Sequence, residues 1–219
     1  MMKRIILMIA AAALVYIPNS IAQDFKELLS KNFNAFESTH ELPQKMEYSN
    51  KIGLISKKWT NEWAAHYYNA YSKAALSYQE TDEAKRDAYL DEAERELEEA
   101  VALLKKDNDE TYVLAAMLAN ARMAVKPQAR WQKYGKIFEE NLSKAKELNA
   151  NNPRIYHLQG LSKYHTPKMF GGGKKAALPY LEKADGLFAK EGTDDITRPY
   201  WGKRTNDYFL QLAKGEDKE

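Results

Sequence analysis

The stretch NNPRIYHLQGLSKYHTPKMFGGGKKAALPYLEKADGLFAK, residues 151–190, decides the fold of this chain. Asn152 and Pro153 form a helix start, because an asparagine side chain caps free N–H groups and proline needs no partner at the first helical position. Apolar residues then recur at helical spacing as far as Tyr164. Pro167 ends the helix, since the residue before a proline is disfavoured in the α conformation. The stretch therefore begins with an amphipathic helix.

A second helix follows a turn that contains three glycines, over residues 166–174. Proline is tolerated only in the first turn of a helix, so Pro179 predicts a helix start near Lys175. Gly160 lies inside the first helix, where glycine costs about 1 kcal/mol relative to alanine, so we expect a neighbouring helix to approach it closely. The buried face of the second helix is marked by Ala177, Leu181, Ala184 and Phe188. The two helices are predicted to form an antiparallel hairpin.

The turn itself, Phe170-Gly171-Gly172-Gly173-Lys174-Lys175, has two interpretations. It precedes a helix N-terminus, whose free N–H groups can bind a phosphate. It also lacks the spacing of a P-loop, has no serine or threonine after the lysines and follows a helix rather than a strand. We favour a simple turn, in which glycine supplies left-handed conformations and Phe170 plugs the end of the hairpin.

Two earlier segments repeat the hairpin pattern. Their second helices carry a final alanine marker at Ala100 and Ala145, equivalent to Ala184. The predicted repeats cover roughly residues 59–106, 109–150 and 153–190. Two packing helices precede them, over residues 24–38 and from Leu42 to about Lys57, and a capping helix follows over roughly residues 198–214. Residues 23–219 are thus predicted to form a single all-α domain.

This pattern resembles the tetratricopeptide repeat, in which a small residue of the first helix packs against Ala-x-x-x-large-x-x-Ala of the second. Gly160 matches the small residue, and Ala177, Leu181 and Ala184 match the second helix. The resemblance implies a right-handed solenoid of stacked antiparallel hairpins. The motifs Asn-Pro-Arg, Tyr-His-Thr-Pro and Phe-Gly-Gly-Gly-Lys are similar to those of exported envelope proteins from Bacteroidetes-type bacteria, and the outline is similar to the periplasmic T component of TRAP transporters.

Residues 1–22 are predicted to be a secretory signal peptide. Lys3 and Arg4 precede an apolar run, and small residues occupy the positions before a cleavage site after Ala22. The alternative is a membrane anchor, but the run is shorter than the roughly 20 residues that span a bilayer. We therefore expect a periplasmic protein with no membrane span after cleavage. The chain has no cysteine, which excludes disulfides and a lipidated cysteine.

The charge balance gives no sign of a nucleic acid or an anionic membrane as partner. The chain has 33 Lys and Arg against 31 Asp and Glu, and Lys3 and Arg4 of the predicted signal account for the excess. His157 and His165 share one helix face, but a metal site needs a closer spacing or a third ligand. We predict no metal site, no cofactor and no catalytic residues. The aromatic residues between Trp59 and Tyr78 favour core packing over a ligand cage.

We expect a non-enzymatic binding or scaffold protein that recognises a peptide or protein partner in the cell envelope. A stack of hairpins has a concave wall made by its first helices, and aromatic and arginine side chains often dominate interfaces. Helical spacing assigns to this wall Asn61, Tyr68, Asn69, Met117, Asn120, Arg154, His157, Leu161, Tyr164 and His165. The structural alternative is that these residues cover a closed groove. The functional alternative is an accessory solute-binding component of an envelope transport system that holds a small acid in a pocket.

Overall fold

The computed structural model describes residues 24–215, and every regular element among them is a helix. A helix over residues 24–38 is followed by α2 (Leu42–Lys58), α3 (Trp63–Gln79), α4 (Glu83–Leu104), α5 (Asp109–Val125), α6 (Pro127–Leu148), α7 (Pro153–His165), the short η1 (Lys168–Phe170), α8 (Lys174–Phe188) and α9 (Lys203–Lys214). The all-α prediction is confirmed over this part of the chain. The expected signal peptide and the last four residues of the C-terminal tail lie outside it.

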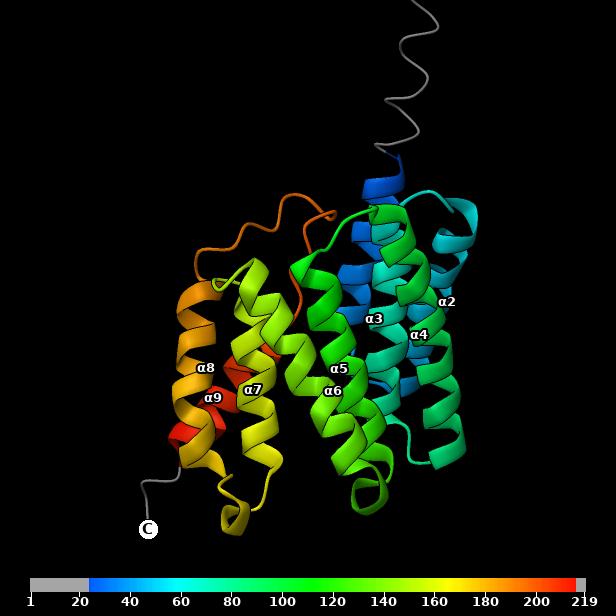
Figure 1. Cartoon of the computed structure of the whole chain (residues 1–219). Helices are drawn as coiled ribbons and strands as arrows, with labels where there is room; N and C mark the ends of the chain where they lie inside the picture. Colours follow the sequence, from blue (N-terminus) through cyan, green and yellow to red (C-terminus); the bar gives the residue numbers. More distant parts are fainter. Residues whose placement is uncertain (1–23, 216–219) are drawn as a thin grey trace, which may run out of the picture.

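The helices lie side by side as antiparallel pairs, and each pair is formed by neighbours in the sequence (Figure 1). α3 packs on α4, α5 on α6 and α7 on α8, while α3, α5 and α7 also contact one another in a row. α2 packs on α3 at one end, and α9 packs on α8 and α7 at the other. The turns within the three pairs therefore all lie at the same end, the lower end in Figure 1. None of the described helices has the length and apolar character needed to cross a bilayer.

The close approach of α7 and α8 explains the glycine inside α7. A Cβ atom built on Gly160 would lie 2.6 Å from Cδ2 and 2.8 Å from Cγ of Leu181, so a side chain there would displace the core of the pair. The expectation for Gly160 is confirmed. Pro179, in contrast, lies inside α8 beyond its first turn, because the helix already begins at Lys174. The expected start near Lys175 is thus confirmed to within one residue, although Pro179 lies just beyond the first turn, where the helix tolerates the missing N–H donor.

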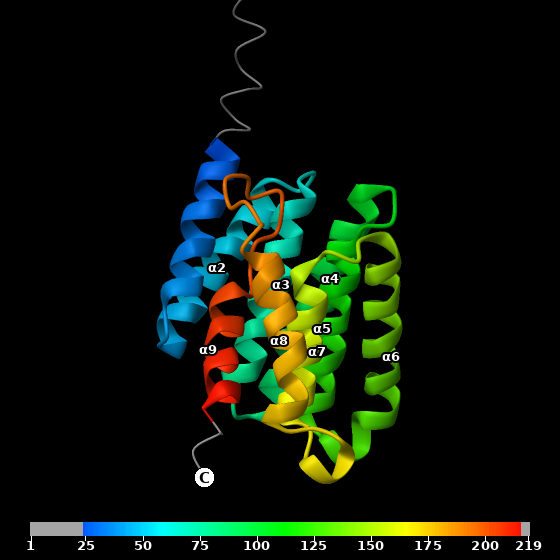
Figure 2. The ribbon, with the colours of Figure 1, turned by 90° about the vertical axis from the view of Figure 1, so that its left-hand side faces the viewer.

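Two segments from opposite ends of the chain meet beside α3 (Figure 2). They are the helix over residues 24–38 and the segment between α8 and α9, residues 189–202, which we call the α8–α9 segment. Tyr200 of that segment shares a hydrogen bond of 3.3 Å with the Ser30 hydroxyl and donates one to Asn34. Lys26 forms an ion pair of 3.0 Å with Asp195. The two ends of the chain thus form one layer.

The interior under this layer is aromatic. The rings of Phe33 and Tyr68 lie 4.4 Å apart between centroids, and those of Tyr71 and Trp201 lie 4.8 Å apart. All four residues are buried. The aromatic run of α3 therefore forms core, as expected, and its packing partners come from both ends of the sequence.

Candidate functional site

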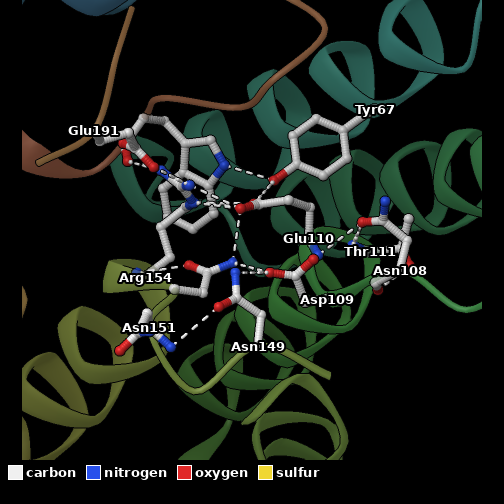
Figure 3. A network of polar contacts seen from close by, with 11 residues as sticks. Tyr67, Asn108, Asp109, Glu110, Thr111, Asn149, Asn151, Arg154 and Glu191 are labelled. Atoms are coloured by element: carbon white, nitrogen blue, oxygen red, sulfur yellow. Dashed lines mark hydrogen bonds and ion pairs between the residues drawn. The ribbon is translucent and has the colours of Figure 1, made fainter. Parts of the chain in front are cut away.

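A buried charge network joins α3, α5, α7 and the α8–α9 segment (Figure 3). Its centre is Arg154, a residue only 2% exposed, which donates from Nη2 to Glu110 Oε1 at 2.7 Å and also pairs with Glu191. Glu110 accepts a further hydrogen bond from the Tyr67 hydroxyl, and that hydroxyl accepts one of 2.7 Å from Nε1 of Trp201. One guanidinium thus pairs with two carboxyl groups.

Burial sets the electrostatics of this network. Burial raises the pKa of Glu110, and the charge of Arg154 together with its hydrogen bonds offsets part of that shift. An arginine stays protonated in proteins, so Arg154 keeps its positive charge beside this carboxyl group. Breaking one side of such a pair leaves an uncompensated buried charge. The network therefore holds the α8–α9 segment against α5 and α7.

Glu110, Arg154 and Glu191 of this network also line a polar cleft of about 640 Å³ at the upper end in Figure 1. It lies between the start of α5, the α6–α7 turn, the start of α7 and the α8–α9 segment. Several lining side chains are already bound to each other: Asn149 and Asn152 both donate 2.9 Å hydrogen bonds to Asp109. Its lining contains no histidine, methionine or tyrosine.

A second set of side chains gathers at the opposite end, where α7 meets α9. We call it the α7–α9 aromatic surface and define it as Tyr164, His165, Tyr208 and Phe209. The ring centroid of Phe209 lies 4.8 Å from that of Tyr164, 5.4 Å from that of His165 and 5.2 Å from that of Tyr208. The ring pairs are edge-on, which is the favourable geometry for aromatic contacts. Tyr208 remains 58% exposed, so part of the surface faces solvent.

His165 differs from the other three histidines in its hydrogen bonds. His66 contacts Glu96 at 2.7 Å, His157 contacts Asn206 at 3.2 Å, and His40 contacts Arg204. No hydrogen bond is recorded for either ring nitrogen of His165 among the described residues. Partial burial lowers its pKa, so the ring is neutral at neutral pH. Within the described residues, His165 is therefore the histidine whose ring nitrogens could bind a ligand without first breaking another hydrogen bond.

The residues expected on the concave wall are split between interior and surface. Tyr68, Asn69, Arg154 and His157 are buried beneath other elements, and Met117 is 7% exposed. Burial also lowers the pKa of His157 to about 4. These side chains reach a partner only if the covering segments move. Asn61 and His165 are exposed, and Asn120, Leu161 and Tyr164 are partly exposed.

The residues that mark the α7–α8 hairpin in the sequence also differ in their burial. Ala177 and Ala184 are buried, as expected for the inner face of α8. Pro167 follows the end of α7, and Gly171, Gly172 and Gly173 form the turn before α8. Phe170 does not plug the hairpin end, because its side chain is 70% exposed. Within the described residues, no group of three or more side chains has the composition of a metal site.

Sequence reasoning missed the acidic partners and the aromatic residues of α9. Glu110 and Glu191 look like ordinary surface acids in the sequence, and only the fold brings them to Arg154. Tyr208 and Phe209 were assigned to a capping helix, with no role in binding. Their adjacency gave no signal, because two neighbouring aromatic residues of a helix can both be buried, as Tyr67 and Tyr68 are.

No family model matches this chain, and no curated protein matches it. Among solved structures, the chain is similar to the HusA haemophore from Porphyromonas gingivalis, with a TM-score of 0.69 and 32% sequence identity. The match covers 88% of this chain and 94% of that chain. It agrees with the expected likeness to exported helical proteins of Bacteroidetes-type bacteria and with a binding protein rather than an enzyme. The chain belongs to the family of the HusA haemophore.

Proposed function

We propose that this protein binds a flat tetrapyrrole of the haem type on the α7–α9 aromatic surface and carries it without chemical change. The supporting observation is the family relation to a haemophore, together with four ring side chains at one end of the molecule. A tetrapyrrole presents a broad apolar face, and aromatic rings supply matching surface. The side chains fit this ligand, because tyrosine and histidine are also known protein ligands of haem iron.

The polar cleft is a poorer match for a tetrapyrrole. Its floor consists of ion pairs and amide hydrogen bonds, which a large apolar face would bury without compensation. One observation favours the other ligand class considered from the sequence, a small acid. The side chains of Lys190 and Arg198 line the cleft, and neither side chain forms a hydrogen bond or ion pair within the described residues. Stabilisation of the protein by succinate, lost in Arg198→Gln, would support that second function.

The remaining finer assignments are part of this proposal. The row of hairpins supports a tetratricopeptide-like arrangement with α9 as its cap. The apolar start of the sequence supports export to the periplasm after cleavage at Ala22. Of the expected wall, Tyr164 and His165 belong to the proposed site, while a peptide along the whole wall would need Tyr68 and Arg154 to become accessible.

Titration of the protein with haemin and with metal-free protoporphyrin IX, followed by absorption and by tryptophan quenching, tests the proposal. Tyr208→Ala should weaken binding roughly 2- to 12-fold, the range expected for one aromatic contact. Trp131→Ala is the matched control, because Trp131 on α6 is 59% exposed against 58% for Tyr208. Equal affinity in wild type and Tyr208→Ala, or no saturable binding of either porphyrin by wild type, would contradict the proposal.

His165→Ala separates two modes of binding at this surface. If the imidazole ligates iron, the variant loses affinity for haemin and its absorption spectrum changes, while binding of metal-free protoporphyrin IX is unchanged. If the ring contributes only apolar contact, both porphyrins are weakened alike. His40→Ala is the control, since His40 is also exposed but contacts Arg204.

A further inference from the structure

The α7–α8 turn carries the two most exposed large hydrophobic side chains of the described residues. Met169 is 83% exposed and Phe170 is 70% exposed, and they are adjacent in the short helix η1. The turn projects at the lower end of the bundle in Figure 1, beyond the ends of α7 and α8. Exposed apolar pairs of this kind mark contact sites, because a soluble surface gains nothing from them.

The backbone of the turn holds these side chains outward. Gly171 and Gly173 have φ values of 77° and 95°, which disfavour any other residue. A Cβ atom on Gly172 would lie 2.1 Å from the carbonyl oxygen of Thr166, so only glycine fits at this position. The turn is therefore a preformed structure, and exposure of Met169 and Phe170 follows from its shape.

The backbone N–H groups of the turn are largely paired inside it. Phe170 donates to the Pro167 carbonyl at 2.9 Å, Gly172 to the same oxygen at 3.2 Å, and Gly173 to the Lys163 carbonyl at 2.8 Å. Unpaired backbone groups are the main cost of placing irregular chain in an apolar medium. This turn can enter such a medium with those donors already satisfied.

The sequence on either side of the turn carries charge of one sign. Between Glu147 and Glu182 the sequence has no aspartate or glutamate, although acids and bases are nearly balanced over the whole chain. The turn and its flanks carry instead Lys163, Lys168 and Lys175. Clustered lysines next to exposed apolar side chains favour an anionic lipid surface, because each lysine near such a surface adds attraction.

We propose that the α7–α8 turn docks on an anionic lipid surface, with Met169 and Phe170 in the interfacial region and the lysines on the headgroups. Two apolar side chains are too small a patch for a stable protein interface, which buries about 800 Å² on each partner. They suffice for reversible attachment to lipid, which adds apolar burial to electrostatic attraction. This inference does not depend on porphyrin binding.

Sedimentation with vesicles of phosphatidylcholine, alone or mixed with phosphatidylglycerol, tests the proposal. Wild type should bind the mixed vesicles at least tenfold better, from about fivefold for each lysine that reaches the surface. The double variant Met169→Ser, Phe170→Ser should bind the mixed vesicles more than tenfold more weakly than wild type. Lys168→Gln with Lys175→Gln should remove most of the preference for the anionic lipid.

Two controls isolate the turn. Trp131→Ser removes an exposed aromatic residue from α6, and Lys190→Gln removes an exposed charge after the other end of α8; neither should change binding. Circular dichroism checks the fold of each variant. A fluorescence blue shift of Phe170→Trp with mixed vesicles would place the side chain in the interface. Equal binding by wild type and the Met169→Ser, Phe170→Ser variant, or no binding by wild type, overturns the proposal.

Discussion

Replacing Arg154 with methionine tests the buried charge network directly. Methionine keeps an unbranched apolar stem, so the change removes the guanidinium while leaving much of the packing. Glu110 then loses its Nη2 contact at 2.7 Å and its Nε contact at 2.9 Å, and Glu191 loses its partner. Glu110 stays in the interior, because Tyr67 and Asn152 still hold its carboxylate.

The expected loss of unfolding free energy at neutral pH is about 3–5 kcal/mol, the cost of removing one partner of a buried ion pair. A domain of this size loses about 2–4 °C of melting temperature for each kcal/mol, so the midpoint should fall by about 6–20 °C. Natural domains have only about 5–15 kcal/mol in total. The variant should therefore fold but be much less stable.

The pH dependence gives a sharper readout. Burial raises the pKa of Glu110 in the folded state, and removing Arg154 raises it further. In Arg154→Met, the cost of burying an unpaired Glu110 carboxylate is absent below the pKa of Glu110 in the unfolded chain, because the carboxyl is then protonated in both the folded and the unfolded state. This cost grows as pH rises through the pKa of Glu110 in the folded state. Urea unfolding followed by circular dichroism should show a smaller loss at about pH 5 than at about pH 8.

Two further variants complete this experiment. Glu110→Gln in the Arg154→Met background should restore part of the stability, because it removes the unpaired charge. Arg198→Met is the matched control, since Arg198 lines the same cleft but is exposed. A loss of unfolding free energy below about 1 kcal/mol in Arg154→Met, equal at both pH values, would refute the conclusion that the network holds α5, α7 and the α8–α9 segment together.

Three other predictions concern separate sites. Gly160→Ala should lower the unfolding free energy by about 1–3 kcal/mol because its Cβ would overlap α8, whereas Gly186→Ala, at an open position, should not; urea unfolding measures both. The hydrogen bond to Glu96 raises the pKa of His66, so this pair stabilises below the ordinary histidine pKa and loses its effect as pH rises through the raised value; Glu96→Gln should flatten that part of the stability profile. Hydrogen bonds from two arginines lower the pKa of Asp87 to about 2, so Asp87→Asn should shift acid unfolding to higher pH.

The helices and their inner faces could be predicted from the sequence because those signals are local. The side-chain oxygen of Asn152 accepts a hydrogen bond of 3.0 Å from the Arg154 N–H and so caps α7, as the Asn-Pro start indicated. The alanine markers Ala177 and Ala184 are both fully buried. Each of these features depends on residues within a few turns of each other, which is the range over which sequence periodicity operates.

The accessibility of the expected wall could not be predicted, because it depends on segments far away in the sequence. Tyr68 has the spacing of a wall residue, but Phe33 and Tyr200 pack against its ring. Phe170 shows the opposite error: an apolar residue beside a turn was expected to pack inward, and the glycine conformations point it outward. In both cases the exposure of the side chain is set by a long-range contact or by a backbone angle, and neither produces a periodic pattern in the sequence.

The contacts between the two ends of the chain bear on how the molecule reaches its native state. The Ser30–Tyr200 hydrogen bond joins residues 170 positions apart, and Lys26–Asp195 joins residues 169 apart. A row of hairpins that touch only their neighbours can assemble stepwise from any starting pair. Here the first helix can pack on α3 early, but its contacts with the α8–α9 segment form only after the last quarter of the chain has been made, and long-range contacts of this kind slow folding. We therefore expect a folding intermediate in which aromatic residues of α3 are exposed. Aggregation is favoured until the two ends of the chain pack against each other and cover these residues.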